Sequence, residues 1–198
     1  MNKQPSLARF AGSFPLIGLA ARAQSGKSTA ASHLKTQAGY KEDSFAAPIR
    51  QFVATLLGLT VAEMEPVKEK VVDWLGKSPR QMMQTFGTDW GREKVHPDIW
   101  IEACMQRIAR DPKGRYVISD LRFDNEADAI RRMGGAVVHI VRPDALVVNS
   151  HASEAGVKRA AGDFLIVNDG PLEQFHKAID DLLYGMWKGS PSILRAFQ

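Results

Sequence analysis

The chain has almost no cysteine and no long apolar run. Its 198 residues include one cysteine, Cys104, so a disulfide within the chain and a cysteine zinc site are both excluded. No stretch of about 18 uninterrupted apolar residues occurs, so we expect no membrane-spanning helix. Residues 1–12 carry neither the long apolar segment nor the cleavage signature of an export signal. We therefore expect a cytoplasmic protein that does not contact a membrane.

Positive charge is in slight excess and is not concentrated in one place. The formal net charge is +4, and the 26 lysines and arginines are scattered along the chain. A stable nucleic-acid surface would gather such residues in one patch, so none is expected. The five histidines lack metal-ligand spacing, and no Ser-His-Asp set can be inferred. Scattered arginines instead suit a small phosphorylated substrate, whose oxygens a guanidinium binds in pairs.

Residues 18–28 have the pattern of a phosphate-binding loop between a strand and a helix. The apolar run 14–20 is typical of a central parallel strand, and after the loop small or apolar residues recur every four positions until Gly39. The loop follows the pattern Gly-x-x-x-x-Gly-Lys-[Ser/Thr], except that Ala21 replaces the first glycine. If that position needs a positive φ, alanine costs about 1 kcal/mol there. The alternative interpretation is an ordinary turn with a solvated lysine.

This pattern binds phosphates through the backbone. Amide N–H groups at the turn and the helix start point at the phosphate oxygens, Lys27 reaches the terminal phosphates, and the Ser28 hydroxyl can ligate Mg²⁺. We therefore expect ATP and Mg²⁺ as ligands. The residues expected to bind ATP in this loop are Ala23, Gln24, Ser25, Gly26, Lys27, Ser28 and Thr29.

Strand and helix patterns alternate along the chain. Strands are expected at 16–20, 116–119, 136–141 and 164–167, with a weaker candidate near 44–45. Helices are expected to begin at Pro97, Asp124 and Pro171. The alternation predicts an α/β fold, a doubly wound parallel sheet with helices on both faces. Without repeats or an obvious linker, we expect a single domain over residues 1–198.

Two stretches depart from this alternation. Residues 60–94 are helical, charged and without a strand, and we expect them to form a substrate-binding insertion. A helix expected over residues 79–86 would place Arg80 and Gln84 on one face. An amphipathic helix with a solvated polar side is the alternative. Residues 143–162 have the size and polarity of a lid, whose closure would keep water from accepting the phosphoryl group.

A carboxylate follows the strand expected at 116–119. Asp120 matches the second P-loop element, whose aspartate helps to hold the metal ion. Carboxyl ends of strands in a doubly wound sheet open on the ligand crevice, so Asp120 should emerge near Lys27. Arg122, two residues later, would contact the transferring phosphoryl group. The alternative is that Arg122 forms a surface salt bridge with an acidic neighbour.

Six blocks of sequence, in order, resemble those of the bacteriophage deoxynucleoside monophosphate kinases. The most specific is Ser78–Glu93 (SPRQMMQTFGTDWGRE), which a generic P-loop protein does not require. The other five are Gly26–Thr29 (GKST), Ser44–Gln51 (SFAAPIRQ), Val117–Ala127 (VISDLRFDNEA), His151–Glu154 (HASE) and Val167–Gly170 (VNDG). The resemblance covers nearly the whole chain. The chain departs from the family pattern at Ala21 and at Ala47, where an aspartate often stands.

The resemblance implies a P-loop kinase-like fold and ATP-dependent phosphorylation of a deoxynucleoside monophosphate (dNMP), giving dNDP and ADP. It implies the host bacterial cytoplasm as the site of action if the chain is phage-encoded, and it leaves a homodimer open. Asn168 would lie on the adenine side of ATP, and Arg142 would join Lys27 and Arg122 in neutralising the transition state. The residues expected to contact the dNMP are Arg50, Arg80, Gln84, Trp90, Arg92, Glu126, His151 and Glu154.

Two rival functions stay open on the sequence. One is a P-loop kinase for another small phosphorylated acceptor, such as dephospho-coenzyme A or phosphomevalonate. The other is a nucleotide-dependent binding or motor ATPase, whose expected signs are a concentrated basic patch and an arginine finger from a neighbouring subunit. The accepted bases and the discrimination between deoxyribose and ribose are not specified by these patterns.

Overall fold

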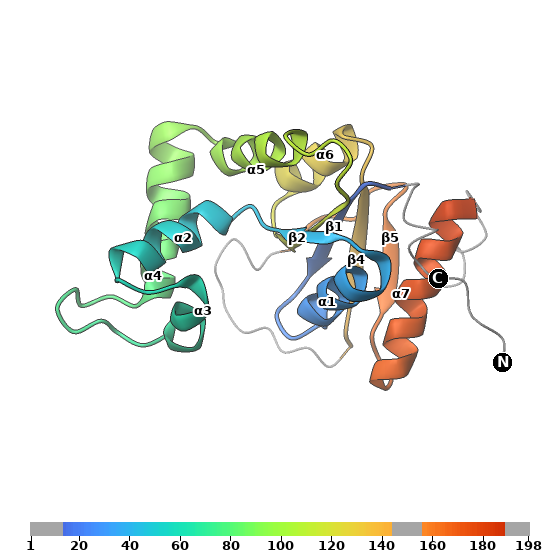
Figure 1. The fold of residues 1–198 in the computed structure, drawn as a ribbon, viewed down its shortest axis with the longest axis horizontal. Helices are drawn as coiled ribbons and strands as arrows, with labels where there is room; N and C mark the ends of the chain where they lie inside the picture. The colour runs from blue at the N-terminus through green and yellow to red at the C-terminus, as the bar shows by residue number, and fades with distance from the viewer. Residues whose placement is uncertain (1–13, 144–155, 189–198) are drawn as a thin grey trace. The chain divides into compact units, whose positions relative to one another are not determined.

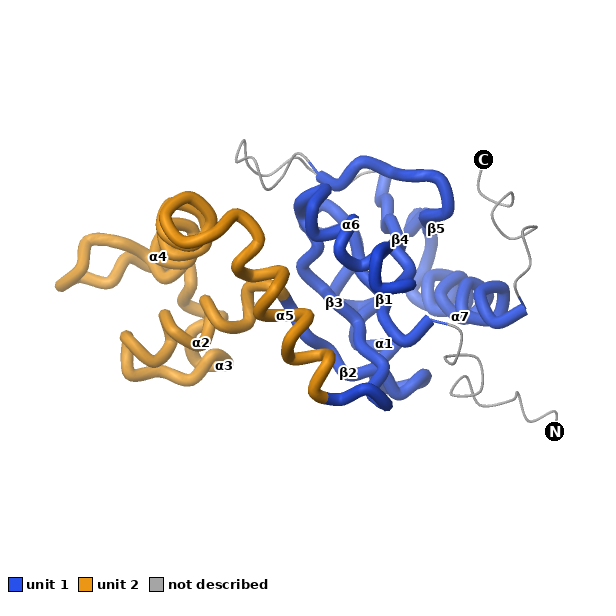
Figure 2. The backbone as a smooth tube through the Cα atoms, turned by 90° about the horizontal axis from the view of Figure 1, so that it is seen from above, with its two compact units in different colours: residues 1–44, 111–198 blue, residues 45–110 orange. Residues whose placement is uncertain are grey.

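The computed structural model of the chain describes residues 14–143 and 156–188. The chain forms two compact units (Figure 2). Unit 1 combines the residues before 45 with those after 110, and unit 2 consists of residues 45–110. Unit 1 contains the sheet, whereas unit 2 is helical.

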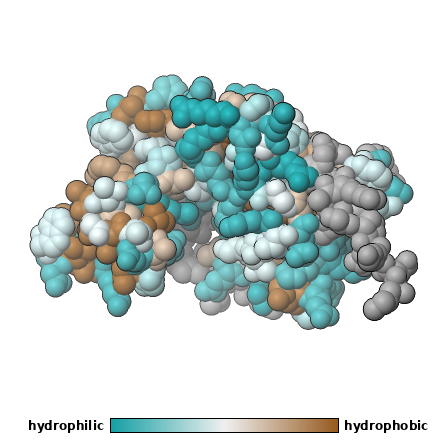
Figure 3. Space-filling view, in the orientation of Figure 1, coloured by the Kyte–Doolittle hydropathy of each residue, from teal (hydrophilic) through white to brown (hydrophobic). Residues whose placement is uncertain are grey.

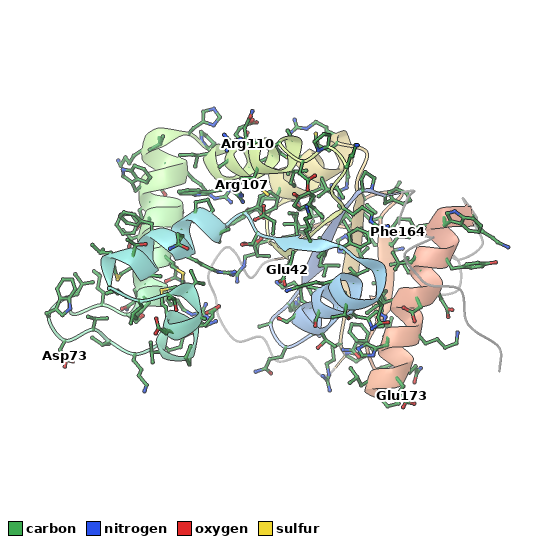
Figure 4. The ribbon with its side chains drawn as sticks, viewed as in Figure 1. Glu42, Asp73, Arg107, Arg110, Phe164 and Glu173 are labelled. Carbon is green, nitrogen blue, oxygen red and sulfur yellow. The ribbon has the colours of Figure 1, made fainter. Side chains whose placement is uncertain are left out.

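Unit 1 is built on a five-stranded parallel sheet in the order β2-β3-β1-β4-β5 (Figure 1). The strands are β1 (Leu16–Ala21), β2 (Lys41–Asp43), β3 (Tyr116–Leu121), β4 (Ala136–Val141) and β5 (Phe164–Val167). Strand β1 is central, between β3 and β4, and its first five residues are buried because both of its faces are covered. In Figure 4, Glu42 marks the edge strand β2 and Phe164 marks the edge strand β5.

Helices pack on both faces of this sheet. They are α1 (Lys27–Ala38), α6 (Asp124–Arg132) and α7 (Leu172–Lys188). Ile17 and Leu19 of β1 share one core cluster with the buried residues of α1 and α7. Gly18 between them points to the opposite face, where an added Cβ would lie 2.3 Å from Cδ1 of Ile130 on α6. The predicted α/β fold, a parallel sheet flanked by helices, is therefore confirmed.

Unit 2 consists of helices around a small core. They are α2 (Ala47–Leu56), α3 (Val61–Met64), η2 (Glu65–Val67), α4 (Pro79–Gln84), η3 (Thr85–Val95) and α5 (Ile99–Ala109). The core joins Val53 and Ala54 of α2 to Met64 of α3 and Met82 of α4. Helix α4 begins where the sequence predicts, but after six residues it gives way to η3, an 11-residue π-helix. The stretch 60–94 lies within this unit and contains one isolated β-bridge but no strand.

Hydrophobic side chains are visible on the surface of unit 2 (Figure 3). Phe52 and Leu56, one turn apart on α2, are both half exposed, and the Phe52 ring meets the Phe86 ring edge to face at 4.6 Å between centroids.

None of the helices in the described ranges is long and apolar enough to cross a membrane.

Some local expectations were wrong. The weak strand expected at 44–45 is instead β2 at Lys41–Asp43, whose three charged residues gave no strand signal. Ser44 and Phe45 are buried just after the strand, which is why the apolar pattern pointed to them. Helix α7 begins at Leu172, one residue after the predicted Pro171, and Leu172 is exposed.

Candidate active site

The loop that joins β1 to α1 has the backbone that a phosphate-binding turn requires. Gly26 adopts φ +98° immediately before α1, and Gln24, at φ +62°, is the one non-glycine residue with a positive φ in the described ranges. Ala21 is instead the last residue of β1 and pairs with Ile140 of β4. The strain considered for an alanine at this position therefore does not arise. The departure from the glycine pattern leaves the turn intact.

The start of α1 offers an electrostatic site for an anion. Within the described chain, no side chain caps this helix, and its first turn contains no acidic residue. The 12-residue helix presents the positive end of its dipole and the amides of its first turn at this point. Lys27 is the first residue of the helix and Ser28, which is exposed, the second. The side chains and the backbone thus favour the same kind of ligand.

Asn168, which follows β5, is hydrogen-bonded to the loop and stabilises it. Its side-chain amide donates a hydrogen bond of 3.0 Å to the carbonyl oxygen of Ser25, and its backbone N–H donates to the carbonyl oxygen of Val141 at 2.7 Å. A Cβ at Gly26 would lie 2.6 Å from Nδ2 of Asn168 and 3.1 Å from the Phe175 ring. Glycine is therefore required at position 26 by both its φ and its surroundings.

Asp120 lies at an irregularity of the sheet. Strand β3 pairs with β1 in register up to Ile118 opposite Gly18, but the next pair joins Leu121 to Ala20, so β3 carries one extra residue there. Such a bulge turns side chains away from the regular alternation. Asp120 is 7% exposed, and its carboxylate lies near the carboxyl end of the strand next to β1.

Arg122 follows β3 in a turn that Glu126 stabilises. Oε2 of Glu126 accepts hydrogen bonds from the backbone N–H groups of Arg122 at 2.9 Å and Phe123 at 3.1 Å. Glu126 is 2% exposed, so its carboxylate is committed to the start of α6. These bonds fix the backbone at the position that carries the Arg122 side chain.

These segments meet at a pocket in unit 1. Its lining residues are Ala21, Arg22, Ala23, Lys27, Leu121, Arg122, Gly156 and Val157. Three of them are cations, and no carboxylate occurs among the described residues that line it. Asp120 is not part of the lining. The pocket brings together Lys27 and Arg122, which the sequence singles out, and has the charge that a phosphorylated ligand needs.

Five lining residues were not predicted as site residues: Ala21, Arg22, Leu121, Gly156 and Val157. Arg22 is exposed and lies inside the phosphate-loop pattern, where its positive charge was the signal that could have singled it out. Gly156 and Val157 lie within the stretch 143–162 that was expected to form a lid, and only the fold places them in the pocket wall.

The other predicted site residues fall into three groups. Five lie on unit 2: Arg50 on α2, Arg80 and Gln84 on α4, and Trp90 and Arg92 on η3. Of these, Arg80 pairs through Nε with Glu69 at 2.5 Å, and Trp90 is half exposed. Arg142, just after β4, is exposed. His151 and Glu154 lie outside the described residues, as does most of the expected lid.

Comparison with known proteins shows the family to which the chain belongs. The family model described as deoxynucleotide monophosphate kinase matches residues 58–179, more than half of the chain. A protein of Acanthamoeba polyphaga mimivirus, named as a deoxynucleotide monophosphate kinase, is 34% identical over 183 residues, which cover 83% of this chain and 93% of the relative. The chain belongs to the deoxynucleotide monophosphate kinase family. The resemblance inferred from the sequence blocks is thereby confirmed, and this family member is a phosphotransferase.

Two phage members of the family match over shorter stretches. The deoxynucleotide monophosphate kinase of Enterobacteria phage T4 is 35% identical over 109 residues, which span 54% of this chain and 45% of the phage protein. The deoxynucleoside-5'-monophosphate kinase of Escherichia phage T5 is 37% identical over 87 residues, which span 40% of this chain and 35% of the relative. Each of these matches thus covers less than half of the phage enzyme's length.

Proposed function

We propose that this family member transfers the γ-phosphoryl group of ATP to the 5′-phosphate of a 2′-deoxynucleoside monophosphate, giving ADP and dNDP. The observation that carries the proposal is the pocket of unit 1, in which Arg22, Lys27 and Arg122 gather beside the start of α1. Three basic side chains in the lining favour a ligand with several negative charges. Family membership favours a nucleotide over the other small phosphorylated acceptors considered.

The donor phosphates would lie on the loop before α1. The backbone amides of residues 23–29 and the Lys27 ammonium would bind the phosphate oxygens, and Asn168 would hold the loop through its bond to Ser25. Because the Asn168 side-chain amide is hydrogen-bonded to Ser25, it would affect adenine binding by holding the loop in place. Arg22 adds a cation that the loop pattern alone does not demand.

The chemistry of two side chains supports the binding of a magnesium ion. The Ser28 hydroxyl in the first turn of α1 and the Asp120 carboxylate at the bulge of β3 are hard oxygen donors, which Mg²⁺ prefers. We assign the binding of this ion to those two residues together with the donor phosphates. When bound, the ion supplies charge neutralisation on the phosphate oxygens.

The protein's own residues would act mainly by positioning and electrostatics. Lys27 and Arg122, with Arg142 as a further candidate, would offset the negative charge that spreads over the transferring group in the transition state. The acceptor phosphate is already an anion, so no general base is required. Glu126 would act through Arg122, because its carboxylate fixes the backbone turn on which that arginine stands.

We assign the acceptor subsite to unit 2. The support is the family resemblance of the block 78–93 and the half-exposed indole of Trp90, which could stack on a base or sugar. Arg50, Arg80 and Arg92 would supply positive charge for the monophosphate, and Gln84 a hydrogen-bonding amide. The ion pair between Arg80 and Glu69 would have to open or be shared for Arg80 to bind phosphate.

The decisive test is a coupled assay of ADP release. The acceptors are the four common dNMPs, their ribonucleotide counterparts, dephospho-coenzyme A and phosphomevalonate. We expect turnover with at least one dNMP, little ATP hydrolysis without an acceptor, and a loss of at least about a hundredfold in Lys27→Ala. Lys35→Ala is the matched control, because Lys35 is an exposed lysine of the same helix. Rapid hydrolysis without acceptor, or stimulation by DNA, would contradict the proposal.

We also propose that the enzyme acts in the cytoplasm, that of the host cell if a phage encodes it, and forms no stable complex with nucleic acid. The modest net charge of +4 supports the second point. A homodimer is a further proposal, supported by the half-exposed Phe52 and Leu56 on α2. Sedimentation equilibrium at assay concentrations tests it, and a monomer at all concentrations would exclude it.

A further inference from the structure

Asp163 is a buried carboxylate outside the parts of the site described so far. It lies just before β5, and its side chain is 2% exposed. Arg131 of α6 donates to both of its oxygens, from Nε at 2.9 Å and from Nη2 at 2.6 Å. The Ala160 backbone N–H donates to Asp163 at 2.9 Å, and Nε2 of His139 on β4 lies 2.9 Å away. So many partners on one buried group indicate a fixed junction between α6, β4 and the segment before β5.

A second attachment ties the same segment to the start of α6. The backbone N–H of Lys158 donates a hydrogen bond of 2.8 Å to Oδ1 of Asp124, the first residue of that helix. Arg131 also donates from Nη2 to the carbonyl oxygen of Lys158 at 3.5 Å. Residues 158–163 are thus held to α6 at both of its ends, through Asp124 and through Arg131.

The Asp163 carboxylate is held in its ionised form at this junction. Burial alone would raise the pKa of Asp163, but the hydrogen bonds from Arg131, Ala160 and His139 outweigh it and hold that pKa below its usual value. Asp128 accepts a further hydrogen bond from Nη1 of Arg131 at 2.7 Å, on the solvent side. Asp163 is therefore ionised at neutral pH, and its attraction for Arg131 is present under assay conditions.

The attached segment leads directly into the pocket wall. Gly156 and Val157, which immediately precede Lys158, line the pocket that also contains Lys27 and Arg122. Asp124 lies two residues after Arg122, so one short stretch of chain both supplies a pocket cation and holds the segment that contributes Gly156 and Val157 to the wall. We infer that Asp124 and the Arg131–Asp163 pair are positioning residues, which fix Gly156 and Val157 in the wall and thereby set the affinity for the donor nucleotide. The identity of that ligand rests on the proposed function.

The test compares two substitutions at Asp124. Asp124→Ala removes the acceptor of the Lys158 N–H, whereas Asp124→Asn keeps an oxygen in its place and loses the same negative charge. In Asp124→Ala we expect the KM for ATP to rise about fivefold, as the loss of one hydrogen bond implies, with the KM for the dNMP unchanged. In Asp124→Asn both constants should stay within about twofold of the wild type, since one retained bond outweighs the lost surface charge.

Amide hydrogen exchange provides a readout that does not depend on the reaction. In the nucleotide-free full chain, residues 156–163 should exchange faster in Asp124→Ala than in Asp124→Asn, while β5 exchanges equally in both. Arg131→Lys should act in the same direction, because lysine keeps the charge but cannot make the paired bonds to Asp163. If Arg131→Lys does not fold, the Asp124 pair still decides the question.

The outcomes separate this inference from the proposed function. Equal exchange in the two Asp124 variants would overturn the attachment, and faster exchange with an unchanged affinity for ATP would overturn its role in donor binding. If the wild type phosphorylates no dNMP, the proposed function fails, and the dissociation constant for ATP, measured by calorimetry, replaces KM in the same comparison. A wild type that does not bind ATP would overturn both.

Discussion

Replacing Gly26 with alanine tests whether the phosphate loop is held by close packing as well as by its backbone conformation. Gly26 has φ +98°, and a Cβ there would lie 2.6 Å from Nδ2 of Asn168. The left-handed backbone alone costs an alanine about 1–2 kcal/mol. Because the Asn168 amide must also move, its 3.0 Å bond to Ser25 is lost between buried groups, which adds about 1–3 kcal/mol. We expect the free energy of unfolding to fall by about 2–5 kcal/mol in total.

Gly162→Ala is the matched control for the strain. Gly162 has φ +93°, and a Cβ there would meet no atom within 4 Å, so the backbone cost alone should appear, about 1–2 kcal/mol. Urea unfolding of both variants gives the difference between them, which we expect to be about 1–3 kcal/mol. In the Asn168→Ala background the clashing amide is absent, so the stability losses caused by Gly26→Ala and Gly162→Ala should become more similar.

Two results would refute this reasoning. If Gly26→Ala and Gly162→Ala lose the same stability, the predicted contact with Asn168 has no energetic effect. If the difference between them persists unchanged in the Asn168→Ala background, another contact is responsible, and the Phe175 ring, 3.1 Å from the added Cβ, becomes the group to examine. Nucleotide binding should weaken more in Gly26→Ala than in Gly162→Ala, because Gly26 lies in the loop that would bind the phosphates.

Three further predictions concern other parts of unit 1. Gly18→Ala should lower the free energy of unfolding by about 1–3 kcal/mol in urea, because its Cβ would lie 2.3 Å from Cδ1 of Ile130. Adding Ile130→Val removes that atom and should recover part of the lost stability. If nothing is recovered, the contact with Ile130 is not the cause. Arg122→Ala should lower kcat about a hundredfold in the ADP-release assay, whereas Arg132→Ala, at an exposed position of α6, should leave it unchanged; equal activities would remove Arg122 from the catalytic set. Burial, partly opposed by Arg115, raises the pKa of Tyr40 to about 12. Because this folded-state pKa exceeds the unfolded value, the associated stability is complete below about pH 10 and is lost as the pH rises towards 12. Tyr40→Phe should therefore show a smaller loss of stability between pH 10 and 12, and an unchanged alkaline profile would count against this assignment.

The parts of the fold that the sequence predicts are those with a local cause. Strand β1 is a short apolar run, and α1 buries Ala30, Leu34 and Ala38 before it ends at Gly39 with φ +69°. Of the pocket cations, Lys27 was found because it belongs to the phosphate-loop pattern, and Arg122 because it follows an apolar strand pattern that ends in a carboxylate.

The parts that were missed depend on contacts between distant segments. Asp163 meets Arg131 and His139 across gaps of more than 20 residues, and nothing in their own neighbourhoods signals the pairing. The change from α4 to the π-helix η3 is likewise invisible in the side-chain pattern. The hydrogen bonds from the Arg122 and Phe123 backbone N–H groups to Glu126 are also not signalled by the sequence pattern.

Strand β2 also affects how the protein behaves when it is concentrated. It is an edge strand of only three residues, and all of them, Lys41, Glu42 and Asp43, carry charge. An edge strand this short and charged is a poor template for a strand of another molecule. Only a few backbone hydrogen bonds could form between the two strands, and the charged side chains of β2 would have to be brought into the contact. This margin of the sheet therefore resists the strand-to-strand aggregation to which exposed β-edges are prone.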